Sequence, residues 1–114
     1  MPHNLSRSDE LILLAVWKLG DDAYGASILD YLQQETGREW SIAGVYAPLK
    51  RMAKSGLLRS RTGRPTPERG GRRKRVYELT AHGVRALQNA RAEYESMWSG
   101  LPKDTAPSGF GGAS

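Results

Sequence analysis

The first apolar run of the chain, Leu11–Trp17, places apolar side chains on every side of a helix. Ser6 or Ser8 is a suitable N-cap upstream of it, and two carboxylates follow in what would be the first turn. Gly20 is a natural end, because glycine readily adopts the left-handed conformation that closes a helix. The pattern predicts a first helix that is buried on several faces.

Two further helices are predicted. Tyr24–Glu35 carries a narrow apolar stripe and stops before Gly37. Ser41 is a suitable N-cap for a third helix that runs to about Ser55. Its apolar residues are spaced for one face, namely Ile42, Val45, Leu49 and Met52. The outward side is left with small and basic residues, Ala43, Gly44, Ala47, Lys50, Arg51 and Lys54.

A pair of short strands follows. Leu57–Arg61 and Arg73–Leu79 have strand-like patterns, whereas Gly63–Gly71 contains so many prolines and glycines that no regular structure is expected there. The two strands therefore form a hairpin with a long loop.

The last predicted helix begins after Thr80 and carries a heptad-like seam. The seam consists of Val84, Leu87, Arg91, Tyr94, Trp98 and Leu101. Such a seam packs either against a second copy or back on its own domain, and we expect a homodimer. The order of elements predicts a mainly α fold with a small β-hairpin. We divide the chain into an N-terminal domain at 1–80, which holds three helices and the hairpin, a C-terminal dimerisation helix at 81–101 and a flexible tail at 102–114.

The positive charge is concentrated in one segment. The whole chain has a net charge of +5, whereas Leu57–Arg75 holds eight Lys or Arg and a single acid, Glu68. That segment contributes +7, so the rest of the chain carries −2. A solvated loop is the plain interpretation, but Lys50, Arg51 and Lys54 extend the patch onto a helix, which favours nucleic-acid phosphate as the partner.

Several other functions are disfavoured by composition. Cysteine is absent, which excludes disulfides and thiolate chemistry. The histidines, His3 and His82, have no nucleophile or acid grouped with them, so we predict no enzyme, no metal site and no cofactor. The apolar run at Leu11–Trp17 is too short to cross a bilayer and no secretory signal precedes it. We expect a cytoplasmic protein with no membrane partner.

Three helices followed by a hairpin with a charged tip is the order of a winged helix-turn-helix, whose third helix enters the major groove of duplex DNA. Small residues on the outward side of this helix let its backbone approach base edges, and cations of the wing bind phosphates. The predicted DNA contacts are Ala43, Gly44, Tyr46, Lys50, Arg51, Arg64, Arg69, Arg72, Arg73 and Lys74.

An ordered set of short motifs resembles the PadR-type transcriptional regulators over nearly all of Asp9 to Trp98. The motifs are Leu11-Ile12-Leu13-Leu14, Tyr24-Gly25, Gly44-Val45-Tyr46-Ala47-Pro48-Leu49-Lys50-Arg51-Met52, Lys54-Ser55-Gly56-Leu57-Leu58, Gly70-Gly71-Arg72-Arg73-Lys74, and Tyr77-Glu78-Leu79-Thr80 with Gly83. The chain departs from the usual pattern at Ala47, which separates the tyrosine from Pro48, and in a longer loop at 64–69.

The resemblance implies a homodimeric repressor of the short branch of the family, in which the last helices form the dimer and a small aromatic ligand relieves repression. It implies dimer contacts through the seam from Val84 to Leu101, and a ligand site at Tyr94, Trp98 and Arg91, where the rings would stack on a flat molecule and the guanidinium would select an acidic group.

Two rival functions remain open at this point. A winged helix can serve as a protein-interaction module, with its basic wing docked on an acidic partner. RNA binding has less support, because the aromatic residues are scattered and do not form a stacking platform. We assign DNA contact to Tyr46 and core support to Tyr77.

Overall fold

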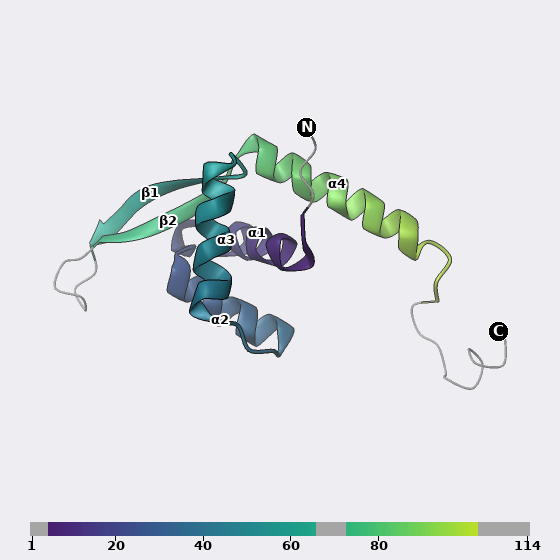
Figure 1. Cartoon of the computed structure of the whole chain (residues 1–114), viewed down its shortest axis with the longest axis horizontal. Coiled ribbons are helices and arrows are strands. Elements are labelled where there is room, and N and C mark those ends of the chain that lie inside the picture. The colour runs from purple at the N-terminus through teal and green to yellow at the C-terminus, as the bar shows by residue number, and fades with distance from the viewer. Residues whose placement is uncertain (1–4, 66–72, 103–114) are drawn as a thin grey trace.

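The structure, a computed structural model, describes residues 5–65 and 73–102 (Figure 1). In chain order its elements are α1 (Arg7–Leu19), the short 3₁₀ turn η1 (Gly20–Asp22), α2 (Gly25–Thr36), α3 (Ile42–Lys54), β1 (Leu58–Pro65), β2 (Arg73–Leu79) and α4 (Ala81–Trp98). The fold is mainly helical with a two-stranded antiparallel hairpin, as the sequence predicts. The predicted flexible tail lies outside the described residues from 103 onward.

Three of the helices have an N-cap residue with a hydroxyl side chain. Ser6 Oγ accepts a hydrogen bond from the Asp9 amide at 3.0 Å, and Ser41 Oγ accepts one from Gly44 at 2.8 Å. Thr80 Oγ1 does the same for Gly83 at 3.1 Å. Each bond satisfies an amide that has no partner inside its helix, so these short local sequences set where α1, α3 and α4 start.

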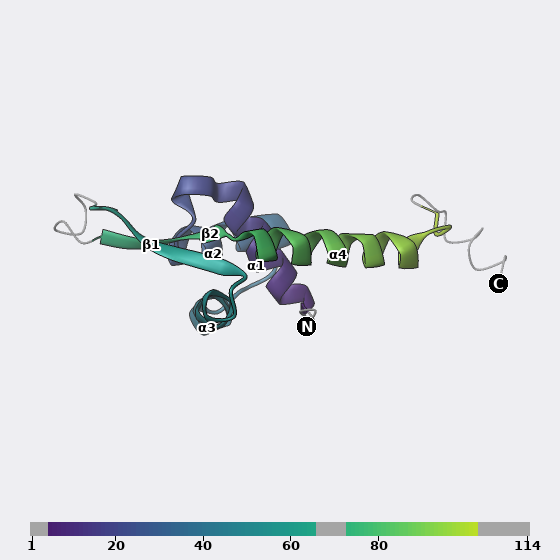
Figure 2. The ribbon, with the colours of Figure 1, turned by 90° about the horizontal axis from the view of Figure 1, so that it is seen from above.

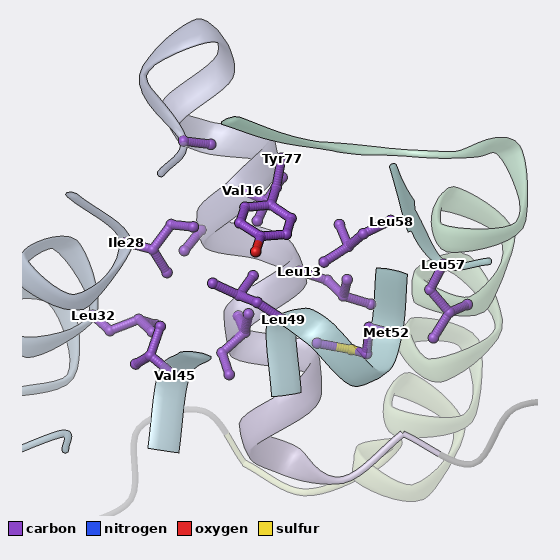
Figure 3. Packing of buried hydrophobic residues seen from close by; sticks show 13 residues of the cluster. Leu13, Val16, Ile28, Leu32, Val45, Leu49, Met52, Leu57, Leu58 and Tyr77 are labelled. Atoms are coloured by element: carbon purple, nitrogen blue, oxygen red, sulfur yellow. The ribbon is translucent and has the colours of Figure 1, made fainter. Parts of the chain in front are cut away.

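The core lies where α1, α2 and α3 meet the base of the hairpin (Figure 3). Its buried members include Leu13, Val16, Ile28, Leu32, Val45, Leu49, Met52, Leu57, Leu58 and Tyr77. The α3 helix runs without a break through Pro48, although the proline nitrogen cannot donate to the Gly44 carbonyl.

Burial differs from the apolar pattern in two helices. The α1 helix buries Ile12, Leu13, Ala15 and Val16, but its Leu14 and Trp17 are 42% and 63% exposed. Ile42, which we expected in the core, is 65% exposed. It shares the apolar spacing of α3, but it is the first residue of the helix and lies beyond the part that packs on α1 and α2.

The hairpin is longer than predicted. We expected no regular structure from Gly63 onward, yet β1 extends to Pro65. The pairing register shifts between Thr62 and Pro65, and such an irregularity lets an antiparallel pair include a proline. Gly63 is buried against the Val76 side chain, where a Cβ atom would have no space.

The free edge of β2 is bound to the connection between α1 and α2. The Tyr77 amide donates to the Ala23 carbonyl at 2.8 Å, and Tyr24 forms an isolated antiparallel bridge with Val76. The hairpin and the helices are therefore joined through the backbone as well as through the core.

The α4 helix packs on α1 and β2 at its start and then extends away from the body, opposite to the hairpin (Figure 2). The helix ends at Trp98, so Leu101, which we expected in its last turn, lies just after it. The Leu101 amide donates to the Trp98 carbonyl at 2.9 Å. Within 5–65 and 73–102 no helix is long and apolar enough to cross a membrane.

Candidate nucleic-acid interface

The third helix stands out from one side of the molecule. Viewed from above, α3 lies apart from the plane of the hairpin and α4 (Figure 2). Its outward surface is formed by the small residues Ala43, Gly44 and Ala47, together with Tyr46 and Lys50, all exposed. This surface is open to a large partner, because no other described element covers it.

A hollow of about 740 Å³ separates α3 from the hairpin. It brings together three cations and three tyrosines from α3, β2 and the segment that precedes α2. The lining residues are Tyr24, Gly25, Ala26, Tyr46, Lys50, Ala53, Ser60, Lys74, Arg75 and Tyr77. Two of the predicted contacts on α3 and one of those on the wing thus face the same space.

The N-terminus of α2 forms one wall of this hollow through Gly25 and Ala26. The first amides of a helix have no acceptor inside it and carry the positive end of the helix dipole. The Tyr46 ring lies against Gly25 so closely that any Cβ atom there would overlap it.

The cations of the hollow are held near tyrosine rings or hydroxyls. Lys74 Nζ lies 3.7 Å from the centroid of the Tyr24 ring, and an Arg75 guanidinium nitrogen donates to Ser60 Oγ at 3.0 Å. No carboxylate of the described part of the chain lies within 4.0 Å of the Lys50 or Lys74 ammonium. These two charges can therefore act on an anion from outside.

Tyr77 forms the floor of the hollow. Its side chain is buried in the core, as the sequence suggested. Burial raises the pKa of the Tyr77 phenol, because the charged form would lose hydration, so the phenol is neutral at physiological pH. The hollow thus has no negative charge at its base.

Other basic residues form ion pairs with carboxylates of the same chain. An Arg51 guanidinium nitrogen lies 2.7 Å from a carboxylate oxygen of Asp9, a buried residue of α1. On the hairpin, Arg59 pairs with Glu78 at 2.9 Å and Arg61 with Asp21 at 3.2 Å. The charge count of the sequence treated these arginines as free, and the pairing residues are too distant in sequence to be recognised from it.

The remaining predicted wing contacts cannot be placed as side chains. Arg69 and Arg72 lie outside the described residues. Arg64 and Arg73 belong to β1 and β2, but the described part does not include their side chains.

The predicted seam on α4 is only partly free. Val84, Tyr94, Trp98 and Leu101 are exposed, whereas Leu87 packs against the core of its own domain. The Tyr94 and Trp98 rings are neighbours, with centroids 5.5 Å apart and planes tilted by 31°. Arg91, expected to select an acidic ligand, bonds Glu95 at 3.0 Å.

Sequence reasoning missed Gly25 and Arg75 as parts of the hollow. Gly25 has a signal in the Tyr24-Gly25 motif, but the requirement for glycine comes from Tyr46 on another helix. Arg75 alternates along β2 with Lys74 and Val76, and only the packing of the hairpin beside α3 brings it to the hollow.

Comparisons with known proteins agree with this architecture. A family model described as the transcriptional regulator PadR-like family matches residues 13–89, more than half of the chain. No curated protein matches the sequence of this chain.

The solved structures that are similar to the chain include three bacterial transcriptional regulators. A PadR family transcription regulator from Clostridium difficile is 29% identical, with a TM-score of 0.60 over 81% of this chain and 91% of that one. A transcriptional regulator from Clostridium thermocellum is 20% identical, with a TM-score of 0.65 over 86% and 92%. A PadR family regulator from Eggerthella lenta is 24% identical, with a TM-score of 0.63 over 80% and 77%.

Proposed function

The chain belongs to the PadR-like family of transcriptional regulators, and from this premise we propose that it is a homodimeric repressor whose α3 and hairpin bind operator DNA. Family membership makes it a DNA-binding regulator and not an enzyme. Repression, the dimer and a ligand are the further parts of the proposal.

The observation that carries the proposal is the hollow between α3 and the hairpin. Lys50, Lys74 and Arg75 line it together with the first residues of α2. Ammonium and guanidinium groups beside the positive end of a helix dipole are well suited to a phosphate oxygen. A backbone phosphate bound in the hollow would set the distance between the DNA and α3.

The outward surface of α3 supports base reading. Ala43, Gly44 and Ala47 are small enough to let the helix backbone approach base edges, and Tyr46 and Lys50 supply hydrogen-bond donors at its rim. Arg51 is tied to Asp9 and is left to stabilise the α1–α3 contact.

The proposed dimer uses the exposed apolar residues of α4. Tyr94 and Trp98 on the second half of α4 and Leu101 just after it are exposed, and Leu14 and Trp17 on α1 add exposed apolar surface. A second copy could bury these side chains and place two α3 helices on successive turns of the duplex, about 34 Å apart. The adjacent Tyr94 and Trp98 rings are the proposed stacking surface for a flat aromatic effector.

The salt dependence of duplex binding tests the proposal. Each phosphate contact contributes about −0.9 to the slope of log K against log salt concentration. Lys50→Ala and Lys74→Ala should each make the slope less steep by about 0.9 per protomer. Lys18→Ala, which removes an exposed charge on α1, is the matched control and should leave it unchanged. Equal slopes in all four proteins would exclude the hollow as a phosphate site.

A further inference from the structure

Ile42 is a large aliphatic side chain that the fold leaves uncovered. It is 65% exposed, and no other aliphatic residue larger than alanine is exposed on α3. Its neighbours on the outward surface of the first turn, Ala43 and Gly44, have no side-chain donor or acceptor. The start of the proposed recognition helix therefore presents an apolar contact.

The position of Ile42 is fixed by the turn before it. The Trp40 indole N–H donates to Thr36 Oγ1 at 3.0 Å, and the Trp40 amide donates to Gln33 Oε1 at 3.3 Å. Ser41 then caps α3 through Gly44. The turn between α2 and α3 thus fixes the position of Ile42, the first residue of α3. Because Ile42 is β-branched, its side chain has few rotamers and loses little conformational entropy when it contacts a partner.

Ile42 lies at the border between the buried face of α3 and the side of the proposed DNA contacts. Tyr46 follows Ile42 by four residues and Lys50 follows Tyr46 by four, so each neighbours the next along the helix surface. Tyr46 and Lys50 both line the hollow proposed for a phosphate. A duplex held there would have its major groove along the same face, with Ile42 at the N-terminal end.

The major groove offers one apolar feature among the edges of the four bases, the C5-methyl group of thymine. We propose that Ile42 reads a thymine by packing against this methyl group. The inference rests on the proposed function, because it assumes that α3 lies in the groove, but it adds which base is selected and by which side chain.

The expected effect is small and specific. Burial of one methyl group corresponds to about a four-fold change in affinity, or about fifteen-fold when both half-sites of a dimer lose it. Uracil retains every hydrogen-bonding group of thymine and lacks only the methyl group. Replacing thymine by deoxyuridine therefore isolates the proposed contact.

The experiment uses the full chain. A duplex is selected from a random-sequence library, each thymine of the selected site is replaced in turn by deoxyuridine, and affinities are measured for wild type and Ile42→Ala. Wild type should lose about four-fold at one thymine of each half-site, and Ile42→Ala should lose nothing further there. Ile42→Val, which keeps a β-branched apolar side chain, is the matched control and should remain sensitive.

The outcomes are distinguishable. Failure to select any sequence would overturn the proposed function, and this inference with it. A selected sequence whose uracil substitutions leave wild-type affinity unchanged, or weaken wild type and Ile42→Ala equally, would overturn the inference alone. Because Ile42 is exposed, Ile42→Ala should fold normally, which thermal unfolding verifies; a change in self-association would instead assign Ile42 to an interface between copies and also overturn it.

Discussion

The Tyr46 ring of α3 rests on the backbone of Gly25 at the start of α2, in space that a Cβ atom would occupy. The side chain that we propose as a DNA contact is thus positioned by a residue of another helix. Glycine is needed at position 25 for this approach and not for an unusual backbone conformation, because Gly25 lacks the positive φ found at Gly20 and Gly37.

Gly25→Ala should displace Tyr46 and weaken duplex binding by about five-fold or more, the effect of losing one good contact. Because Tyr46 is 42% exposed, its ring can rotate outward, and the free energy of unfolding should change by less than about 1 kcal/mol. In a Tyr46→Ala background the same glycine substitution should have no effect on affinity. Additive losses in this double-mutant cycle would show that Gly25 does not act through Tyr46.

Gly83→Ala should destabilise the protein by about 1 to 3 kcal/mol, measured by urea unfolding, because a Cβ atom there would overlap the Leu57 carbonyl oxygen and push α4 away from the segment that joins α3 to β1. Ala81→Gly, at the exposed first position of the same helix, is the control and should cost less than about 1 kcal/mol. A Gly83→Ala variant as stable as wild type would contradict the packing of α4 seen here.

Arg51→Ala should lower the free energy of unfolding by about 1 kcal/mol or more, because it leaves the buried Asp9 carboxylate without its partner. Asp9→Asn together with Arg51→Ala should recover part of this loss, since the unpaired charge is gone. Base preference should be the same in Arg51→Ala as in wild type. A change in preferred sequence would return Arg51 to the set of DNA contacts.

Trp98→Ala should shift the protein towards monomer in sedimentation velocity, because it removes a large ring from the exposed end of the α4 seam. Met97→Ala is the neighbouring control, a residue outside the seam that should leave association unchanged. Planar cationic compounds and phenolic acids should quench Trp fluorescence in wild type and release DNA, and the quenching should be lost in Trp98→Ala. If association changes and no compound acts, the seam is a dimer interface only.

Arg72→Ala combined with Arg73→Ala should weaken binding to operator and random duplex alike, and should reduce the salt slope by up to about 1.8 per protomer. In the proposed complex, these wing arginines bind DNA phosphates and do not distinguish one base from another. An unchanged slope would remove these arginines from the mechanism.

The sequence predicted those features that depend on neighbouring residues. Ser6, Ser41 and Thr80 could be recognised as caps because each hydroxyl bonds an amide three residues later. The order of helices and strands then indicated the winged helix, and PadR membership followed from ordered motifs.

The errors have a common cause in contacts between distant segments. Apolar spacing alone did not show that α3 packs on the core only from Val45 onward, so Ile42 was placed inside. The DNA contact of Arg51 stays a prediction, but the spacing could not show that Arg51 pairs with Asp9 of α1, 42 positions earlier. In β1, proline and glycine composition predicted a loop from Gly63, whereas pairing with β2 continues to Pro65.

The bridge between Tyr24 and Val76 has a consequence for how the wing can vary. It fixes the root of the hairpin to the start of α2, so the base of the wing and the helix-turn-helix form one frame. Residues can then be inserted or removed between Pro65 and Arg73 without transmitting a shift to α3. In the proposed complex with DNA, the reach of the wing along the DNA backbone and the bases selected by α3 can therefore be altered independently of each other.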